Sequence, residues 1–262
     1  MNIVNITAST VAVCTFACST AAGGLVNFLV TNTGGTIYEI DGQTMQANEV
    51  STLDSNANLN EILYEGNYSI LYNDSNRIMR HNLLTSQETL VFDTSIGFND
   101  GATVAAGLAH TGNGNLFYSA NRIAPGKSAV YAITANPTSQ SATTALMDER
   151  PTFFDHHMVG NNLFIGATYL HNEIVFTDSN TGVIEDRFSV NIAIVSFFEN
   201  TEGIFAMTKE GELHSVDLQS RSLSFYGQIS GTSGNLIGAT VPSPSTLVCI
   251  GVLSITGMRR RR

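Results

Sequence analysis

The residues with the clearest chemical potential are Asp155, His156 and His157, which stand side by side. Residues 152–159 predict a β-strand, on which Asp155 and His157 face one way and His156 the other. A carboxylate and an imidazole on one face can bind a metal ion or exchange protons with a substrate. A metal site needs three or four converging ligands, however, and the sequence provides at most two on this face.

Two other histidines could approach this pair. His110 belongs to a predicted inner strand, and His81 to a predicted second-layer strand. Asp155, His157 and His110 are therefore the candidate catalytic residues. The interpretation that we favour is that they are polar wall residues hydrogen-bonded to neighbouring loops, with no bound metal and no cofactor.

Other motifs do not indicate a reaction. Residues 54–61 carry acidic and amide oxygens at alternate positions, as in a calcium loop, but Leu59 occupies the position that requires glycine. A polar loop is the better interpretation. Gly34 and Gly35 fit a hairpin turn, and the sequence contains no nucleophile-elbow or zinc-protease motif.

Repeated strands must position these residues. Five short apolar stretches begin 42, 46, 47 and 41 positions apart, at residues 28–32, 70–74, 116–120, 163–167 and 204–208. Each is followed by a second strand, a turn and a third strand. The turns carry Asp or Asn three residues before Thr or Ser, a pattern that folds the side chain onto its own backbone. They are Asp41 with Thr44, Asn82 with Thr85, Asp178 with Thr181, and Asp217 with Ser220, with residues 136–138 as a degenerate copy.

An inner strand precedes four of these hairpins, at residues 59–63, 104–109, 152–159 and 192–197. The first hairpin has none, and residues 235–240 are predicted to supply it from the end of the domain. That pairing would close a ring and remove two exposed sheet edges. The pattern predicts an all-β fold, a β-propeller of about five four-stranded blades. Residues 28–32 also resemble the strand that marks a group of exported propellers. A six-bladed propeller, with a degenerate blade in residues 94–100 or 119–128, and a β-sandwich are the alternatives.

The charge limits the partners. Residues 23–241 contain all 22 acidic residues and 8 basic ones, giving a formal charge of −14. Such a surface repels nucleic acid, so we expect no nucleic-acid partner. The three cysteines, Cys14, Cys18 and Cys249, lie outside this segment, which therefore lacks thiolate chemistry.

The C-terminal residues have three parts in succession. Pro242, Ser243 and Pro244 form an extended turn, residues 247–258 are uncharged and largely apolar, and the chain ends in Arg259, Arg260, Arg261 and Arg262. The apolar run is shorter than the roughly 20 residues of a permanent membrane span. Arginines beside an apolar segment stay on the cytoplasmic side.

This arrangement resembles the PEP-CTERM sorting signal of exported bacterial proteins, except that Ser243 replaces the glutamate of that motif. The resemblance implies a sorting helix that the inner membrane holds transiently, and processing by an exosortase. A basic tag after a buried strand is the alternative.

Residues 1–22 have no charged side chain and fit a secretory signal peptide. Cys18 would allow a lipoprotein signal, which residues 15–17 fit poorly. The expected organisation is thus a signal peptide (1–22), a propeller (23–241) and a PEP-CTERM-like segment (242–262).

Two functions remain open at this point. The first is a non-enzymatic binding or structural module, exported to the cell surface or the extracellular matrix, with extracellular polysaccharide or surface proteins as partners. The second is a lyase or hydrolase that acts on extracellular polymer within the propeller channel. A fold of this kind does not decide between them.

Overall fold

The structure is a computed structural model that describes residues 25–54, 59–74, 77–93, 102–110, 116–122, 128–136, 139–146, 153–159, 163–168, 172–178, 181 and 183–242. The predicted signal peptide at residues 1–22 lies outside this part of the chain. So does the predicted sorting helix, because only Pro242 of residues 242–262 is described. Within the described part every regular element is a strand, and it holds no helix long and apolar enough to cross a membrane.

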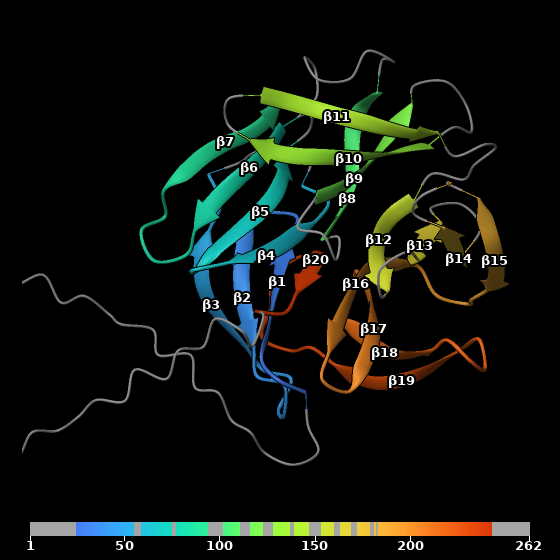
Figure 1. Cartoon of the computed structure of the whole chain (residues 1–262). Helices are drawn as coiled ribbons and strands as arrows, with labels where there is room; N and C mark the ends of the chain where they lie inside the picture. The colour runs from blue at the N-terminus through green and yellow to red at the C-terminus, as the bar shows by residue number, and fades with distance from the viewer. Residues whose placement is uncertain are drawn as a thin grey trace, which may run out of the picture.

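The described strands form five four-stranded antiparallel sheets (Figure 1). From the inner to the outer strand they are β20 (Leu236–Thr240), β1 (Phe28–Asn32), β2 (Thr36–Ile40) and β3 (Ala47–Thr52); β4 (Ile62–Gly66), β5 (Ser69–Asp74), β6 (Arg77–Asn82) and β7 (Glu88–Asp93); β8 (Ala102–His110), β9 (Leu116–Arg122), β10 (Ser128–Asn136) and β11 (Ser139–Leu146); β12 (Phe153–Val159), β13 (Leu163–Thr168), β14 (Glu173–Asp178) and β15 (Ile184–Ser189); β16 (Ile194–Asn200), β17 (Gly203–Thr208), β18 (Glu212–Asp217) and β19 (Ser222–Gln228). Each predicted repeat unit corresponds to one of these sheets, and the two-sheet sandwich is therefore wrong.

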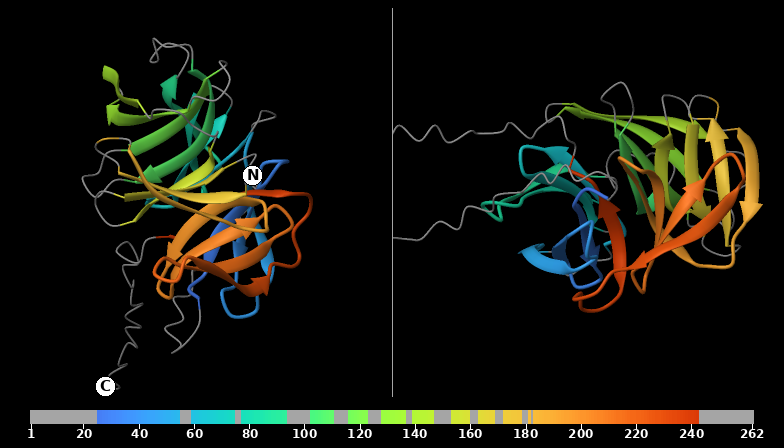
Figure 2. Two further views of the ribbon diagram at one scale, coloured as in Figure 1. Left: turned by 90° about the vertical axis from the view of Figure 1, so that its right-hand side faces the viewer. Right: turned by 90° about the horizontal axis from the view of Figure 1, so that it is seen from below.

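The inner strands β20, β4, β8, β12 and β16 contact one another in cyclic order and return from β16 to β20. Figure 2 shows the sheets arranged around this centre. The ring closes where β20 pairs antiparallel with β1, for example Leu29 with Thr240 and Val30 with Ala239. The predicted pairing of residues 235–240 with residues 28–32 is confirmed, and it protects the inner edge of β1 from solvent.

Burial decreases from the inner to the outer strands. All seven residues of β16 except Glu199 are buried, whereas β19 has no buried residue. Apolar side chains fill the spaces between neighbouring sheets. One cluster, with Leu29, Ile37 and Tyr72, lies between the first and second sheets, and another joins the fifth sheet to the first. The core is thus divided among the interfaces between sheets.

The predicted turns form as expected. The Asp41 carboxylate accepts backbone N–H groups of Gln43 and Thr44 at 2.9 and 2.8 Å, and Asp217 repeats this with Gln219 and Ser220. Asn82 and Asp178 make the same kind of contact. Gly35, with φ of 81°, supplies the left-handed residue of the first hairpin turn.

Two predicted inner strands are displaced. The strand expected at residues 192–197 is β16, Ile194–Asn200. The other displacement has a visible cause. We expected an inner strand at residues 59–63, but β4 covers Ile62–Gly66. The side-chain oxygen of Asn73 accepts the N–H groups of Asn60 and Glu61 at 3.0 and 2.9 Å. This side chain replaces the backbone partners that a ladder would provide, so regular pairing starts only at Ile62.

Candidate functional site

Three polar side chains meet at the centre of the ring, and we call them the central cluster: Glu61, Asp155 and Ser196. Glu61 directly precedes β4, Asp155 lies on β12 and Ser196 on β16. Their exposed fractions are 1%, 1% and 0%. Ionised carboxylates in such a site cost free energy unless hydrogen bonds and protonation compensate.

Backbone amides hold Asp155 from both sides. Its Oδ1 accepts the N–H of His156 and its Oδ2 accepts the N–H of Phe197, both at 2.6 Å. Asp155 is also hydrogen-bonded to the carboxyl group of Glu61. Because both oxygens already accept N–H donors, this bond requires Glu61 to bring the proton.

Glu61 has its own set of donors. Its Oε1 accepts the N–H groups of Ile62 at 2.9 Å and Ala239 at 3.2 Å, and the hydroxyl of Ser196 lies 3.2 Å from its Oε2. The N–H of Ala239 also points at Ser196 Oγ, 3.0 Å away. The central cluster therefore connects β20, β4, β12 and β16.

Electrostatics favours one shared proton. Burial, followed by the charge of Asp155 and the hydrogen bond to it, raises the pKa of Glu61 well above its usual range. Burial also raises the pKa of Asp155, to about 6, although the hydrogen bonds from Glu61, Phe197 and His156 partly oppose this. At neutral pH the pair is best described as a protonated Glu61 donating to an ionised Asp155.

Glycines let the inner strands approach the central cluster. A Cβ on Gly238 would lie 2.8 Å from the backbone nitrogen of Ile62 and 2.9 Å from Glu61 Oε1. A Cβ on Gly107 would lie 2.8 Å from Asp155 Oδ1. The β-ladder shifts register just before Asp155, Ser196 and Gly107, so bulges turn these positions toward the centre.

The structure does not bring the three predicted catalytic residues, Asp155, His157 and His110, together in one described site. Asp155 and His157 share one side of β12, as predicted, and this side faces β16. Asp155 accepts the N–H of Phe197, whereas His157 Nε2 lies 3.7 Å from Glu199 Oε2. The nearby imidazole of His157 lowers the pKa of Glu199. His110 ends β8, and its side chain is outside the described part of the structure.

His156 faces the opposite way, as predicted. It lies against β8, where its Nδ1 would be 2.5 Å from a Cβ on Gly107. Burial lowers the pKa of His156 to about 3. Its imidazole is therefore neutral at physiological pH and adds no charge beside Asp155.

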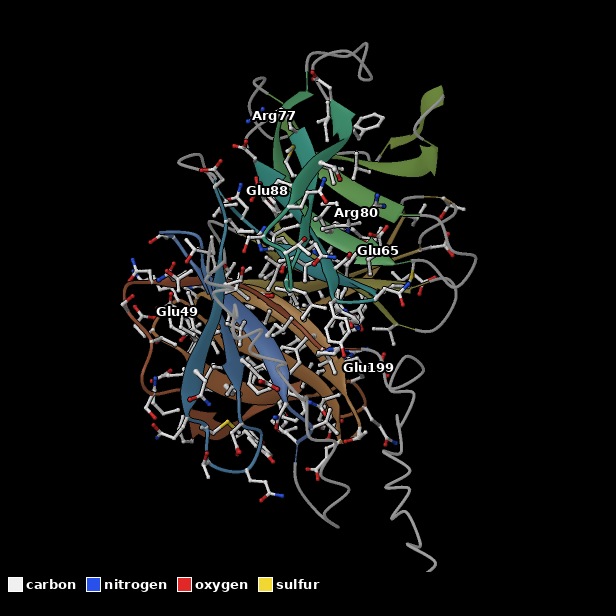
Figure 3. All side chains as sticks on the ribbon, turned by 90° about the vertical axis from the view of Figure 1, so that its left-hand side faces the viewer. Glu49, Glu65, Arg77, Arg80, Glu88 and Glu199 are labelled. Carbon is white, nitrogen blue, oxygen red and sulfur yellow. The ribbon has the colours of Figure 1, made fainter. Side chains whose placement is uncertain are left out.

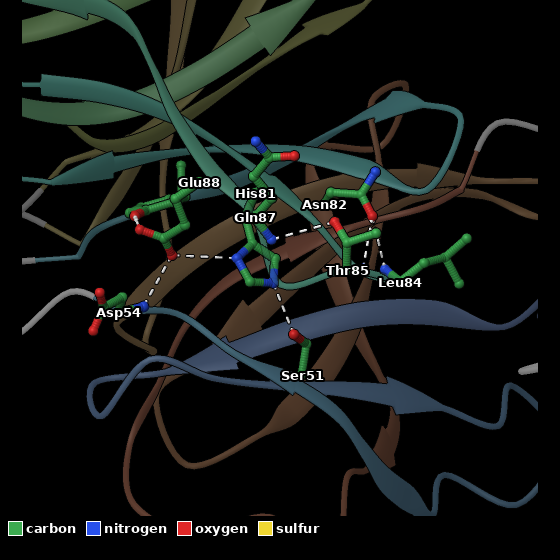
Figure 4. Close-up of polar contacts among 9 residues, drawn as sticks. Ser51, Asp54, His81, Asn82, Leu84, Thr85, Gln87 and Glu88 are labelled. Atoms are coloured by element: carbon green, nitrogen blue, oxygen red, sulfur yellow. Dashed lines mark hydrogen bonds and ion pairs between the residues drawn. The ribbon is translucent and has the colours of Figure 1, made fainter. Parts of the chain in front are cut away.

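A second constellation lies between the first and second sheets, and we call it the seam triad: Ser51, His81 and Glu88 (Figure 4). Ser51 Oγ lies 2.7 Å from His81 Nε2, and His81 Nδ1 lies 3.2 Å from Glu88 Oε1. Glu88 also accepts the N–H of Asp54 at 2.9 Å and the hydroxyl of Tyr72 at 2.7 Å. The suggestion that His81 approaches the channel pair is wrong, because its partners are Ser51 and Glu88.

Burial sets the charge state of the seam triad. His81 is 1% exposed, and burial lowers its pKa although Glu88 partly opposes this. Burial alone would raise the pKa of Glu88, but the bonds from Asp54, Tyr72 and His81 lower it overall. The result is a neutral imidazole beside an ionised carboxylate.

The sequence contained part of this information. The turn at Asn82 places His81 opposite Glu88 on adjacent strands, and the register confirms that pair. Ser51 gave no local signal, and the local pattern around Glu61 did not indicate Asp155, because the partners of these two residues lie 30 and 94 positions away. Within the described residues, no group of three or more His, Cys, Asp or Glu side chains is placed to hold a metal ion.

Comparisons with known proteins identify the fold. No family model matches the chain, and no curated protein sequence matches it. A structure of a protein of unknown function from Bacteroides caccae aligns with a TM-score of 0.54 at 13% identity, covering 78% of this chain and 73% of that one. A chain of the nidogen/laminin complex aligns with a TM-score of 0.52 at 9% identity, covering 84% and 99%. The chain thus has an all-β, propeller-like fold.

Proposed function

We propose that this chain is an exported protein whose propeller, residues 23–241, is a non-enzymatic binding or structural module at the cell surface or in the extracellular matrix. The observation that carries the proposal is the state of the central cluster. Asp155 and Glu61 are buried and hydrogen-bonded to backbone N–H groups, so they are occupied in joining inner strands. A ring held together in this way suits a rigid scaffold that presents its surface to a partner.

A lyase or hydrolase in the channel would need Asp155, His157 and His110 around an open cavity. In the described part of the structure Asp155 is closed off, and His157 faces Glu199 instead. One chain of similar fold comes from a protein–protein complex, that of nidogen with laminin. Surface proteins or extracellular polysaccharide are therefore the partners we propose, with no cofactor.

Export and sorting rest on the two ends of the sequence. The uncharged residues 1–22 would direct secretion, and residues 242–262 would hold the chain at the inner membrane until an exosortase-type enzyme cuts it. Pro242, Ser243 and Pro244 would form the recognition turn, and the four arginines would be lost.

Intact-mass measurement of the protein isolated from its native host tests this proposal. The expected mature mass lacks residues 259–262 and the signal peptide. A mass that still includes the four arginines would refute sorting. Replacing Arg259, Arg260, Arg261 and Arg262 with serine should leave the chain unprocessed if the resemblance to the sorting signal holds.

A further inference from the structure

We infer that Ser51 is a nucleophile activated by His81, forming with Glu88 an acyl-transfer site for small esters in the seam between the first and second sheets. This site is separate from the central cluster. Figure 3 shows Glu88 of the seam triad and Glu199, which lies on the same inner strand as Ser196, in different parts of the molecule. The proposed binding or structural role does not depend on this inference, although a confirmed reaction at Ser51 would mean that the module is not purely non-enzymatic.

The hydrogen-bond directions fix the role of each group. An ionised Glu88 only accepts, so His81 Nδ1 must carry the proton of their 3.2 Å contact. In a neutral imidazole the other nitrogen, Nε2, then has a free lone pair. The hydroxyl of Ser51, 2.7 Å away, donates to it. Nucleophile, base and orienting acid thus have the contacts that activate a serine.

Glu88 acts through His81 and is a positioning residue. It lies directly opposite His81 in the β6–β7 ladder, which fixes its distance from the imidazole. The N–H of Asp54 and the hydroxyl of Tyr72 hold its two oxygens. The imidazole is thereby held in the tautomer that the reaction needs.

The surroundings of Ser51 include apolar side chains that an acyl group could contact. Ser51 is half-buried, and the ladder shifts register at Val50, directly before it. Val50, Met79 and Leu83 are half-buried apolar side chains at the rim of the core between these sheets. They favour an ester with a short apolar acyl chain. Because β3 is the outermost strand of its sheet, its outer backbone edge offers N–H groups that could stabilise an oxyanion.

The reaction balances with water as the second reactant. Ser51 Oγ attacks the ester carbonyl while its proton moves to His81 Nε2. The bond from the carbonyl carbon to the leaving oxygen then breaks, and His81 returns the proton to the departing alcohol. Water, deprotonated by His81, attacks the acyl-serine, and the carboxylic acid leaves as Ser51 recovers its proton.

A fluorophosphonate probe tests the inference on the full-length chain. Attack by Ser51 forms an O–P bond and expels fluoride, so the adduct stays on the protein. We expect one probe per chain, with peptide mass spectrometry placing it on Ser51. We also expect the labelling rate to rise with pH with a midpoint below 6.5, because burial lowers the pKa of His81.

Matched variants distinguish activation of Ser51 by His81 from simple exposure of a serine hydroxyl to the probe. Ser215 is a half-buried serine on β18 whose hydroxyl donates to the backbone oxygen of Ser224, so Ser215→Ala should label like the native chain. Ser51→Ala should not label. His81→Gln should lower the rate at least 100-fold. Glu88→Gln should slow labelling and change its pH profile, and Glu88→Asp should restore part of the rate.

The native chain alone can refute the inference, even if a variant fails to fold. If the native chain takes up no probe on Ser51, the seam triad is only a structural tie between two sheets. Labelling of Ser51 that is equally fast in a folded His81→Gln variant would refute activation by His81. Hydrolysis of a p-nitrophenyl ester that the probe abolishes would extend the result to turnover.

Discussion

Replacing Glu61 by glutamine should leave the protein folded at neutral pH and remove part of its pH dependence. In the native chain Glu61 Oε1 accepts two backbone N–H groups, and the protonated carboxyl group donates to Asp155. A glutamine carbonyl can accept the same N–H groups, and its amide can donate to Asp155 without any proton being taken up. Glu61→Ala removes all three bonds and leaves Asp155 buried without this donor, which should cost about 3–5 kcal/mol.

The sign of the pH dependence follows from the raised pKa values. A buried acid with a raised pKa stabilises the fold fully below its unfolded pKa, near 4, and loses that contribution as the pH rises to its folded pKa. For Asp155, whose pKa rises from 3.8 to about 6, the loss is on the order of 3 kcal/mol between these pH values. Glu61 has the larger shift, so the native chain should continue to lose stability above pH 6.

Urea unfolding between pH 4 and 9 measures this directly. The chain has no tryptophan, so far-UV circular dichroism or tyrosine fluorescence is the signal. The native chain should lose stability in two steps, whereas Glu61→Gln should lose it only up to about pH 6 and then stay level.

Asp155→Asn is the matched control for the proton assignment. In the native chain the N–H groups of His156 and Phe197 each donate to the Asp155 carboxylate at 2.6 Å. The NH₂ group of the asparagine would face one of these donors, which should lower the free energy of unfolding by about 1–3 kcal/mol. The reasoning fails if Glu61→Gln is as unstable as Glu61→Ala at pH 7. It also fails if Glu61→Gln continues to lose stability above pH 6, as we expect of the native chain.

Three further outcomes are expected. Gly238→Ala should lower the thermal midpoint strongly, because its Cβ would meet the backbone of Ile62 at 2.8 Å, while Gly227→Ala, whose Cβ meets only Met45 at 3.5 Å, should change it little. His157→Asn should change stability modestly and abolish no activity, since its described partner is the 61%-exposed Glu199, and elemental analysis should find no stoichiometric transition metal. Truncation before Asn235 should cause aggregation or a much lower midpoint, because it deletes β20 and exposes β1; unchanged melting would contradict ring closure.

Repetition made the fold predictable. The Asp or Asn turns that connect the hairpin strands depend on residues only three positions apart, such as Asp41 with Thr44, and these formed as expected. Ring closure was also predictable, because the first hairpin lacked an inner strand. The start of β4 was not, because it depends on a single side chain, Asn73, from the following strand.

The polar sites were less predictable because they join different sheets. Asp155 was recognised beside two histidines, but its partner Glu61 was assigned to a loop with a calcium-like pattern. The carboxyl groups meet because each lies where an inner strand reaches the centre of the ring, which no local pattern encodes. Likewise, Ser51 is an unremarkable serine on an outer strand until the second sheet brings His81 to it.

The two polar sites differ in what their donors do. In the central cluster, backbone N–H groups occupy the carboxylate oxygens from several inner strands, so its proton serves to hold the ring together. In the seam triad, the N–H of Asp54 and the hydroxyl of Tyr72 donate to Glu88. The hydroxyl of Ser51, on the outermost strand of its sheet, points at an imidazole nitrogen of His81. Loss of the proton shared by Glu61 and Asp155 changes the free energy of unfolding. Loss of the proton of the half-buried Ser51 hydroxyl creates a nucleophile. For this reason pH-dependent unfolding probes the centre of the ring, and covalent labelling probes the seam.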